Sequence, residues 1–320
     1  MSKNVLVTGG AGYIGSHLCK ALALKGYTPV TYDSLKTGHL SAVRFGPFVK
    51  GDILDGPLLL STLRTYKPEA IFHLASYSNT RDSTTEAALY YKNNLIGTHT
   101  LLETLLSCPV PYFIFSSSAS VYGKATDIPL SESSLLIPSS PYGRIKLSSE
   151  LMIADFCESQ SMHYANLRYF NASGADLDAE IGESHYPETH LIPLLIEALK
   201  EEKPFHLFES NHKTHDGTAK RDFVHVSDLA EGHIQALQFL KQNKKSITLN
   251  LGSGKGHTIL DIITDLQTRT QKKIPIYKSS SLEEPACLIA DITLAKELIN
   301  WNPKYSTLDT IIETALRWHS

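Results

Sequence analysis

The chain has 320 residues, a formal net charge of −3 and a charged fraction of 20%. Acidic and basic residues are interspersed, which argues against a nucleic-acid-binding footprint and against a polybasic membrane patch. The length predicts about two domains with ample material for a buried core.

Cysteine usage and the start of the chain indicate a compartment. Four cysteines are scattered without a C-x-x-C pair, so we expect reduced, structural thiols. The first expected strand begins a few residues after Met1, which leaves no room for a signal peptide. No apolar run approaches the roughly 18 residues of a membrane span. We therefore expect a soluble cytoplasmic protein.

The first expected strand, Val5–Thr8, runs directly into a glycine cluster. Residues 4–15 read NVLVTGGAGYIG, and a helical pattern over Ser16–Lys25 follows at once. In this context the spacing G-x-G-x-x-G is typical of a dinucleotide-binding turn, because glycines permit the turn, the close approach of a pyrophosphate and helix packing. The helix N-terminus presents free N–H groups to phosphates. We assign to the cofactor site Gly9, Gly12, Tyr13, Ile14 and Gly15.

An acidic residue follows the second expected strand. Pro29–Tyr32 ends at Asp33, where a carboxylate accepts hydrogen bonds from an adenosine ribose diol, about 20 residues beyond the glycines. A carboxylate repels a 2′-phosphate and no arginine follows closely, so NAD is favoured over NADP. Ser34 and Leu35 complete this expected ribose site. The alternative is that Asp33 merely opens a turn.

The rest of the first half alternates strand and helix patterns. Further strands are expected at Phe48–Gly51, Ala70–Leu74, Tyr112–Ser117 and His163–Tyr169, and helices at Gly56–Tyr66, Thr84–Ser107 and Tyr142–Glu158. Such alternation predicts an α/β fold, a Rossmann-type doubly wound parallel sheet with helices on both faces. Ligands of such sheets bind at the carboxyl ends of the strands.

Two later segments carry residues suited to the oxidation of an alcohol. Ser118 follows the fifth strand, at the expected ligand edge, while Tyr142 and Lys146 share one face at the start of a helix. A neighbouring ammonium and a positive nicotinamide ring would lower the pKa of a tyrosine hydroxyl from about 10 toward working pH. Ser118 can hydrogen-bond the same substrate oxygen and relay a proton. We assign all three residues to hydride-transfer catalysis; a surface helix pair is the alternative.

After about residue 170 the loops lengthen and the rhythm changes. Helices are expected at Pro193–Lys200, Val226–Lys241, Ile259–Thr270 and Thr307–Trp318. We expect an NAD-binding Rossmann domain over residues 1–170 and a smaller α/β substrate domain over residues 171–320, with some chain crossing back to the first domain.

Taken together, these motifs resemble the extended short-chain dehydrogenase/reductase family, and within it the epimerases of UDP-hexoses. The resemblance runs nearly end to end. It rests on the glycine loop and on FIFSSSASVYG at 113–123, SPYGRIK at 140–146, LRYFN at 167–171 and, most specifically, DGTAKRDFVHVSDL at 216–229.

The resemblance implies a tightly held NAD that is reduced and reoxidised within one turnover. Tyr142 would take the proton of the 4′-hydroxyl, and the 4-keto sugar would turn before the hydride returns. The implied activity is therefore an NAD-dependent isomerisation that interconverts UDP-glucose and UDP-galactose. Relatives pair the helices expected at Thr84–Ser107 and Tyr142–Glu158 into a dimer interface, so we expect a homodimer; ordinary cover of the sheet is the alternative.

The resemblance also implies further site residues. Cofactor contacts would extend to Asp52, Ile53, Leu74, Ala75, Ser76, Ser78, Asn93, Phe170 and the three catalytic residues. Contacts with the UDP-sugar would come from Ser118, Tyr142, Asn171, His190, Leu191, His206, Phe208, Arg221 and Glu284. Arg221 has an independent reason, because a guanidinium suits a pyrophosphate; a salt bridge to Asp222 or Asp228 is its alternative.

The chain departs from the family pattern in two places. The family usually carries Arg-Arg-x-Gly-Asp-Pro-Ala near the nucleotide, whereas residues 280–286 read SSLEEPA, so that Ser281 replaces an arginine and Glu284 an aspartate. Losing a charge-assisted contact costs about 1.5–3 kcal/mol of binding unless another base substitutes, and Lys278 is our candidate. The second departure is the segment NTRDS at 79–83. Both departures leave the substrate open.

Other readings remain open. Sugar-nucleotide dehydratases carry Thr-Asp-Glu before Val-Tyr-Gly, but residues 118–120 here read SAS, so elimination is disfavoured. The substrate could be another UDP-sugar: an N-acetylhexosamine, for which Leu288 matches the family's gating position, a pentose or a uronate. A net NAD-dependent oxidoreductase and a catalytically silent NAD-binding protein are the alternatives from other classes.

Overall fold

A seven-stranded sheet forms the centre of the fold. The computed structural model describes residues 3–125, 128–209, 214–280 and 285–320. The strands of this sheet pair in parallel in the order β11-β6-β5-β4-β1-β2-β3. Their bounds are β1 Asn4–Thr8, β2 Thr28–Asp33, β3 Phe48–Lys50, β4 Ala70–His73, β5 Tyr112–Ser118, β6 His163–Tyr169 and β11 Ile247–Leu251. The predicted doubly wound parallel sheet is confirmed.

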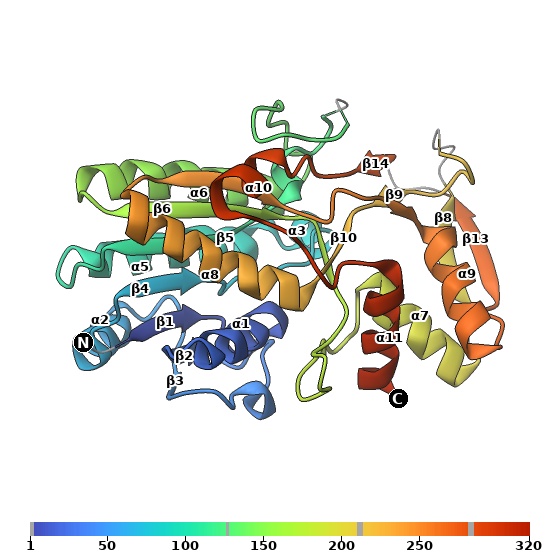
Figure 1. Ribbon diagram of the computed structural model, residues 1–320, viewed down its shortest axis with the longest axis horizontal. Helices are drawn as coiled ribbons and strands as arrows, with labels where there is room; N and C mark the ends of the chain where they lie inside the picture. Colours follow the sequence, from blue (N-terminus) through green and yellow to red (C-terminus); the bar gives the residue numbers. More distant parts are fainter. Residues whose placement is uncertain (1–2, 126–127, 210–213, 281–284) are drawn as a thin grey trace.

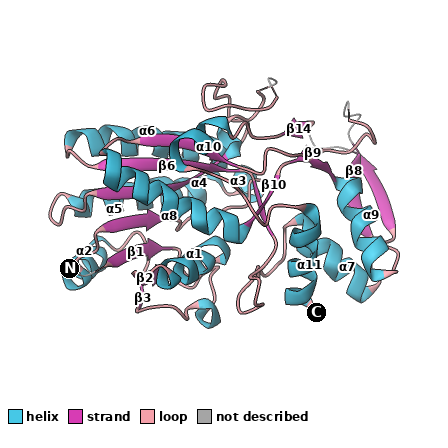
Figure 2. Ribbon diagram, viewed as in Figure 1, coloured by secondary structure: helices cyan, strands magenta, loops and turns pink. Residues whose placement is uncertain are grey.

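Helices cover both faces of this sheet (Figure 2). One face carries α1 (Tyr13–Leu24), α8 (Val226–Asn243) and α10 (Thr293–Ile299). The other carries α2 (Gly56–Tyr66), α5 (Gly97–Leu105) and α6 (Pro141–Ser159). Successive side chains of β1 point to opposite faces of the sheet, which separates two hydrophobic clusters. Val5 and Val7 pack in one cluster and Leu6 in the other.

A second core lies at the right of Figure 1. It joins α7 (Leu191–Glu201), α9 (Ile259–Thr270) and α11 (Leu308–His319). Beside these helices, β8 (Phe205–Glu209) pairs with β13 (Ile276–Ser280). Two small sheets connect the parts: β7 (Asn171–Ser173) with β10 (Phe223–His225), and β9 (Lys220–Arg221) between β12 (His257–Thr258) and β14 (Cys287–Leu288).

The chain crosses back to the first sheet after residue 170. Strand β11 pairs with β6, and α8 packs against α1, so both elements complete a sheet begun by the N-terminal half. The sequence analysis did not predict β11. The division of the chain at residue 170 stays a prediction.

The single helix expected over Thr84–Ser107 is wrong. The chain instead forms α3 (Asp82–Thr85), α4 (Ala87–Tyr90), the π-helix η2 (Tyr91–Ile96) and α5. Glu86 leaves the helical conformation, with φ −116° and ψ 36°. Within η2 the buried Asn94 accepts a hydrogen bond from the backbone N–H of Tyr77 and donates one to its carbonyl. Helical periodicity alone does not reveal such a wide turn, which is frequent at functional sites.

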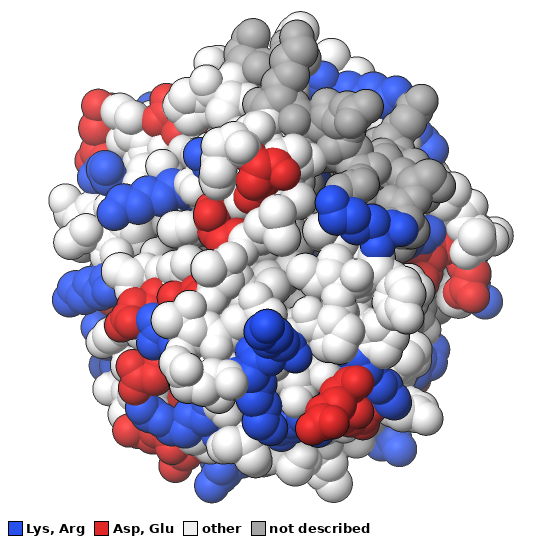
Figure 3. Space-filling view, turned by 90° about the vertical axis from the view of Figure 1, so that its right-hand side faces the viewer, with Lys and Arg blue, Asp and Glu red and all other residues white. Residues whose placement is uncertain are grey.

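The surface agrees with the interspersed charges of the sequence. Figure 3 shows lysine and arginine side chains scattered among aspartates and glutamates over the face at the right of Figure 1. In the part of the chain that the structure describes, no helix is long and apolar enough to cross a membrane.

The glycine loop between β1 and α1 is held by close backbone contacts. A Cβ added at Gly15 would lie 2.1 Å from the carbonyl oxygen of Gly9, which is far inside van der Waals contact. Only a residue without a side chain lets the first turn of α1 pack on the turn that leaves β1. The motif's third glycine therefore has the packing role that its position predicts.

We expect Gly15→Ala to destabilise the protein by about 1–3 kcal/mol, as overpacking does. Helix propensity alone would favour alanine by about 1 kcal/mol, so the clash decides the sign. Gly56→Ala in α2 is the matched control, because its Cβ would meet its nearest neighbour at an ordinary 3.5 Å. Urea unfolding of both variants measures the effect, and an unchanged or increased stability of Gly15→Ala would contradict it.

Candidate active site

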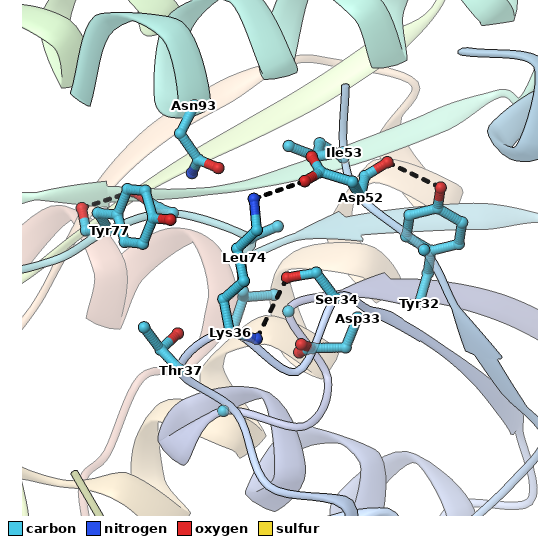
Figure 4. Close-up of a pocket in the computed structure, with 15 residues that line it drawn as sticks. Tyr32, Asp33, Ser34, Lys36, Thr37, Asp52, Ile53, Leu74, Tyr77 and Asn93 are labelled. Carbon is cyan, nitrogen blue, oxygen red and sulfur yellow. Dashed lines mark hydrogen bonds and ion pairs between the residues drawn. The ribbon is translucent and has the colours of Figure 1, made fainter. Parts of the chain in front are cut away.

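A pocket opens at the carboxyl edge of the sheet, around the ends of β1, β2 and β4 (Figure 4). It holds about 570 Å³ of empty space. Its lining includes ten residues that the sequence assigned to the cofactor: Gly9, Gly12, Asp33, Ser34, Asp52, Ile53, Leu74, Ala75, Ser76 and Asn93. In Figure 4 the amide of Asn93 points into the pocket from the helix above it.

Other expected cofactor residues lie beside this lining. Ile14 and Gly15 belong to the first turn of α1, whose leading backbone N–H groups have no partner within a helix. The Tyr13 hydroxyl donates to the carbonyl of Gly174 at 2.6 Å, so its side chain anchors the loop. Leu35 takes the left-handed conformation, with φ 61°. Ser78 is exposed, on the loop that follows Tyr77.

Asp33 organises the glycine loop as well as lining the pocket. One carboxylate oxygen accepts from the Ala11 N–H at 3.0 Å, and the other accepts from the Leu35 N–H at 2.8 Å. Each oxygen keeps a further lone pair that can face a ribose diol. The alternative that Asp33 opens a turn therefore holds, because its carboxylate accepts from the Leu35 N–H, and its contact with a ribose stays a prediction.

The pocket also contains residues that the sequence analysis missed. Lys36 and Thr37 contribute to its lining. Lys36 Nζ lies 2.7 Å from Asp52 Oδ2, and although burial acts in the opposite direction, this contact keeps the pKa of Asp52 below its ordinary value. The two residues are 16 positions apart and come from different loops, so no short sequence motif predicts that they pair.

The three expected catalytic residues meet at the end of β5. Ser118 ends that strand, and Tyr142 and Lys146 occupy successive turns of α6. Tyr142 is 8% exposed and Lys146 3% exposed. The Lys146 ammonium donates to the Ser116 carbonyl at 2.7 Å and lies 5.6 Å from the centre of the Tyr142 ring.

Close packing brings this helix to the strand end. Ser140 caps α6 by accepting from the Gly143 N–H at 3.1 Å. A Cβ at Gly143 would lie 2.5 Å from the Ser120 carbonyl oxygen, so glycine is required for the contact. The Tyr142 N–H donates to Ser83 Oγ at 3.2 Å, which places the unusual segment 79–83 against the catalytic helix.

Burial moves the two titrating groups in opposite directions. It raises the pKa of Tyr142 to about 12, while a hydrogen bond with Ser118 opposes the shift. Burial also lowers the pKa of Lys146 to about 7, against the charge of Glu150. Both shifts favour the neutral form of each residue, because a low-dielectric site disfavours isolated charge.

A buried ion pair lies one turn further along α6. Glu150 and Arg168 are each 5% exposed, and the guanidinium donates to both carboxylate oxygens, from Nε at 2.9 Å and from Nη2 at 2.7 Å. Ser117 also donates to Glu150. The Tyr122 hydroxyl accepts from Arg168 at 3.0 Å, so few polar atoms of this pair lack a partner.

Expected substrate residues lie beyond the end of β6. Phe170 is buried and the next residue, Asn171, begins β7 with an exposed side chain. Arg221, on β9, donates to the carbonyls of Lys220 and Pro285. The acids Asp222 and Asp228 accept hydrogen bonds from other segments, and the structure gives no salt bridge from Arg221 to either among the pairs that it describes.

The remaining expected substrate residues are spread over several elements. Leu191 starts α7, and His206 lies on β8 with its ring stacked on Tyr277 at 5.9 Å. Phe208 follows on the same strand, where its backbone faces Ser279 of β13. Lys278 lies on β13 opposite Leu207. Ser281 and Glu284 lie outside the described residues.

His190 precedes α7 in a cluster of ionisable groups. Its Nδ1 lies 2.8 Å from Glu183 Oε1, and His185 and Glu188 complete the group. Burial lowers the pKa of His190, but Glu183 and Glu188 outweigh it and raise the pKa to about 10. The sequence analysis assigned no role to the other three residues.

Known proteins of similar sequence cover the whole chain and share one family. The model of the NAD dependent epimerase/dehydratase family matches residues 5–252. A UDP-glucose 4-epimerase from Rhizobium meliloti is 41% identical, with 100% of this chain and 98% of that protein covered. One from Halalkalibacterium halodurans is 40% identical over 98% and 95%. This chain belongs to the NAD dependent epimerase/dehydratase family.

Solved structures agree in fold. The UDP-glucose 4-epimerase from Brucella ovis in complex with NAD is 44% identical and superimposes with a TM-score of 0.96 over 98% of this chain and 97% of that one. The enzyme from Bifidobacterium longum, in complex with NAD+ and UDP, is 28% identical with a TM-score of 0.94 over 99% and 98%.

The lowered pKa of Lys146 predicts a pH-dependent stability in protein prepared without cofactor. Between about 7 and 10.5 the unfolded chain holds a proton on this lysine that the folded chain lacks. The free energy of unfolding therefore rises with pH in this window, by at most about 1.4 kcal/mol per pH unit. Lys146→Met lacks this titrating group and so lacks this slope. The free energy of unfolding of the variant, minus that of the wild type, should therefore fall from pH 7 to pH 9.

Lys241→Met is the matched control, because Lys241 is partly exposed and pairs with Glu69 at 2.9 Å. Its difference from the wild type should stay flat over the same range. Urea unfolding at several pH values measures both, and parallel pH profiles for Lys146→Met and the wild type would contradict the prediction.

Proposed function

We propose that this member of the NAD dependent epimerase/dehydratase family interconverts UDP-glucose and UDP-galactose by inverting C4′ of the hexose. The observation that carries the proposal is the meeting of Ser118, Tyr142 and Lys146 at the end of β5, on the sheet edge that holds the dinucleotide pocket. Full-length similarity to UDP-glucose 4-epimerases supports the choice of substrate.

The described pocket suits NAD. The Gly9 and Gly12 backbone and the first turn of α1 would hold the pyrophosphate, and Asp33 would accept from the adenosine ribose. Lys36, the cation in the described lining of this pocket, is engaged by Asp52, so the pocket favours NAD over NADP. When bound, NAD supplies a hydride acceptor that later returns the hydride, and its ring carries positive charge.

Tyr142 and Ser118 would manage the proton of the 4′-hydroxyl. The buried Tyr142 has a raised pKa, so positive charge nearby is needed before it can act as a base at working pH. Protonated Lys146 and the nicotinamide ring would supply that charge. Ser118, close enough to Tyr142 to oppose the rise of its pKa, can donate to the same sugar oxygen and hold it in place.

The nucleotide end of the substrate would lie across the second core. Arg221 offers a guanidinium for the pyrophosphate, and Asn171 follows directly from the sheet edge. Leu191, at the start of α7, and the β8 residues His206 and Phe208 would complete the UDP site, with His190 beside them. We propose the same role for Glu284.

The decisive experiment incubates purified protein with UDP-glucose and no added NAD. We expect UDP-galactose to form, as read by proton NMR. Tyr142→Phe should retain its bound NAD and lower kcat by at least about 100-fold, because the general base is lost. Tyr90→Phe is the matched control, since it removes a hydroxyl from the same buried cluster and should remain active.

Three other outcomes would change the proposed base, reaction or substrate. Full activity of Tyr142→Phe would refute the proposed base. Stoichiometric NADH formation with a net oxidised sugar would indicate an oxidoreductase instead. Faster turnover of the N-acetylated UDP-hexoses in parallel samples would move the substrate to that class.

A second copy of this chain is the proposed protein partner. Large apolar side chains are exposed on adjoining helices: Leu89 (44%) on α4, Tyr91 (37%) and Ile96 (52%) on η2, and Leu151 (61%) on α6. Pairing these helices with their copies would cover this surface, which is the interface that the sequence predicted.

We expect Leu151→Glu to shift the protein from dimer to monomer in light scattering after gel filtration, because it places a charge in the apolar contact. Leu24→Glu is the matched control, since Leu24 is 78% exposed on α1, on the other face of the sheet. A monomeric wild type, or a dimer that survives Leu151→Glu but not Leu24→Glu, would exclude this interface.

A further inference from the structure

Four ligating side chains converge on the loop between β7 and α7. Within the sequence ESHYPETH at 183–190, Glu183, His185, Glu188 and His190 each offer one atom, and these atoms all lie within 4.8 Å of one another. The separations from the two Nδ1 atoms to the two Oε1 atoms are 2.8, 3.5, 3.5 and 3.7 Å.

The converging atoms are buried but poorly satisfied. Glu183 is 4% exposed. Its Oε1 and the Nδ1 atoms of His185 and His190 are shielded from solvent, yet none has a hydrogen-bond partner among the residues that the structure describes. The 2.8 Å approach of His190 to Glu183 is therefore an ion pair without hydrogen-bond geometry, and a metal ion at the centre would satisfy these buried atoms better.

The fourth side chain is held in position by the backbone. Glu188 Oε1 accepts from the N–H groups of Thr189 at 2.7 Å and His190 at 2.9 Å. These two bonds fix the orientation of the carboxylate, as hydrogen bonds to metal ligands do, and leave its other oxygen, Oε2, to bind a metal.

We propose that Glu183, His185, Glu188 and His190 form a four-ligand site for a structural Zn²⁺ ion. Bonds of about 2.0–2.1 Å in a tetrahedron place neighbouring ligand atoms about 3.3 Å apart, close to the observed separations. Two imidazoles and two carboxylates suit zinc better than magnesium or calcium, which prefer oxygen ligands alone. Four protein ligands leave no open position for catalysis.

A second acidic cluster in the same protein lacks these properties. His215, Asp216 and Asp261 also offer three converging ligand atoms. There, however, none of the three side chains is buried, and both carboxylates accept hydrogen bonds: Asp216 accepts from Thr218 and Thr258, and Asp261 accepts from the Thr258 N–H at 2.8 Å. His215 is exposed, so this cluster needs no ion.

The surroundings indicate what the ion would do. The Glu183 carbonyl accepts from Trp318 Nε1 of α11 at 2.8 Å, and the Ser184 carbonyl lies 2.9 Å from His39 Nε2. The cluster leads directly into Leu191 at the start of α7. The ion would therefore fix the loop that joins the two cores, a role that does not depend on the proposed function.

The experiment uses full-length protein without a histidine tag, stripped with EDTA and then titrated with ZnCl₂ against a chromophoric chelator at pH 8. Zinc binding at this pH should release protons, because the raised pKa of His190 leaves its imidazole protonated in the empty site. We expect about one tightly held zinc per chain by elemental analysis after gel filtration. Cobalt in place of zinc should give the intense visible bands of tetrahedral Co²⁺.

Three variants locate the site. His185→Gln and Glu188→Gln should each weaken zinc binding by more than about 10-fold, a loss that even outer-shell changes cause, whereas His215→Gln should bind as the wild type does. Zinc should also raise the Tm of the wild type and of His215→Gln but not of the other two, whose Tm in EDTA reports their folding.

Three outcomes would overturn the proposal. The wild type could fail to retain zinc, which would leave a cluster held together by protons alone. His215→Gln could lose the metal while His185→Gln keeps it. Octahedral cobalt spectra would exclude the four-ligand geometry.

Discussion

The buried pair of Glu150 and Arg168 is the interaction on which the catalytic edge depends. It joins α6 to β6, and through Ser117 it also joins β5. Breaking such a pair by removing one partner costs about 3–5 kcal/mol, because the other charge stays buried. Glu150 is one helical turn from Lys146, so the pair fixes the rotation of the helix that presents Lys146 and Tyr142 to the strand end. Its charge also opposes the fall in the pKa of Lys146.

The same burial leaves the proposed catalytic residues uncharged. A dry site disfavours both the phenolate of Tyr142 and the ammonium of Lys146. In the proposed mechanism, charge must arrive with a ligand before the proton can move, and the pocket at the ends of β1 and β2 is the place where it would arrive. Proton transfer would then be coupled to an occupied site. Low dielectric strengthens each interaction once the charge is present.

Local spacing carried most of what the sequence predicted. The glycine loop, Asp33 and the Tyr142–Lys146 pair depend on residues a few positions apart or on one strand-turn-helix unit, so their pattern is visible in the chain. Three features depend on contacts made only when distant segments meet. They are the Lys36–Asp52 pair, the hydrogen bonds of Asn94 in η2 with the Tyr77 backbone, and strand β11. Residues 247–251 of β11 read ITLNL and do alternate apolar and polar residues, but a five-residue alternation gives neither the partner strand nor the register, which come from pairing with β6. Roles of the individual substrate residues stay predictions for the same reason.

The segment 174–190 shows how the two cores are coupled. The Tyr13 hydroxyl, from the cofactor loop, binds the Gly174 carbonyl, and Lys20 of α1 pairs with Asp176 at 2.7 Å. From α11, Arg317 donates to the Leu177 carbonyl and Trp318 to that of Glu183. One loop is therefore tied to the helix that begins at the glycine motif and to the helix that ends the chain. Since the loop continues into α7, it connects the first turn of α1 to the second core. The proposed cofactor and substrate sites therefore share one loop, which hydrogen bonds fix from both sides.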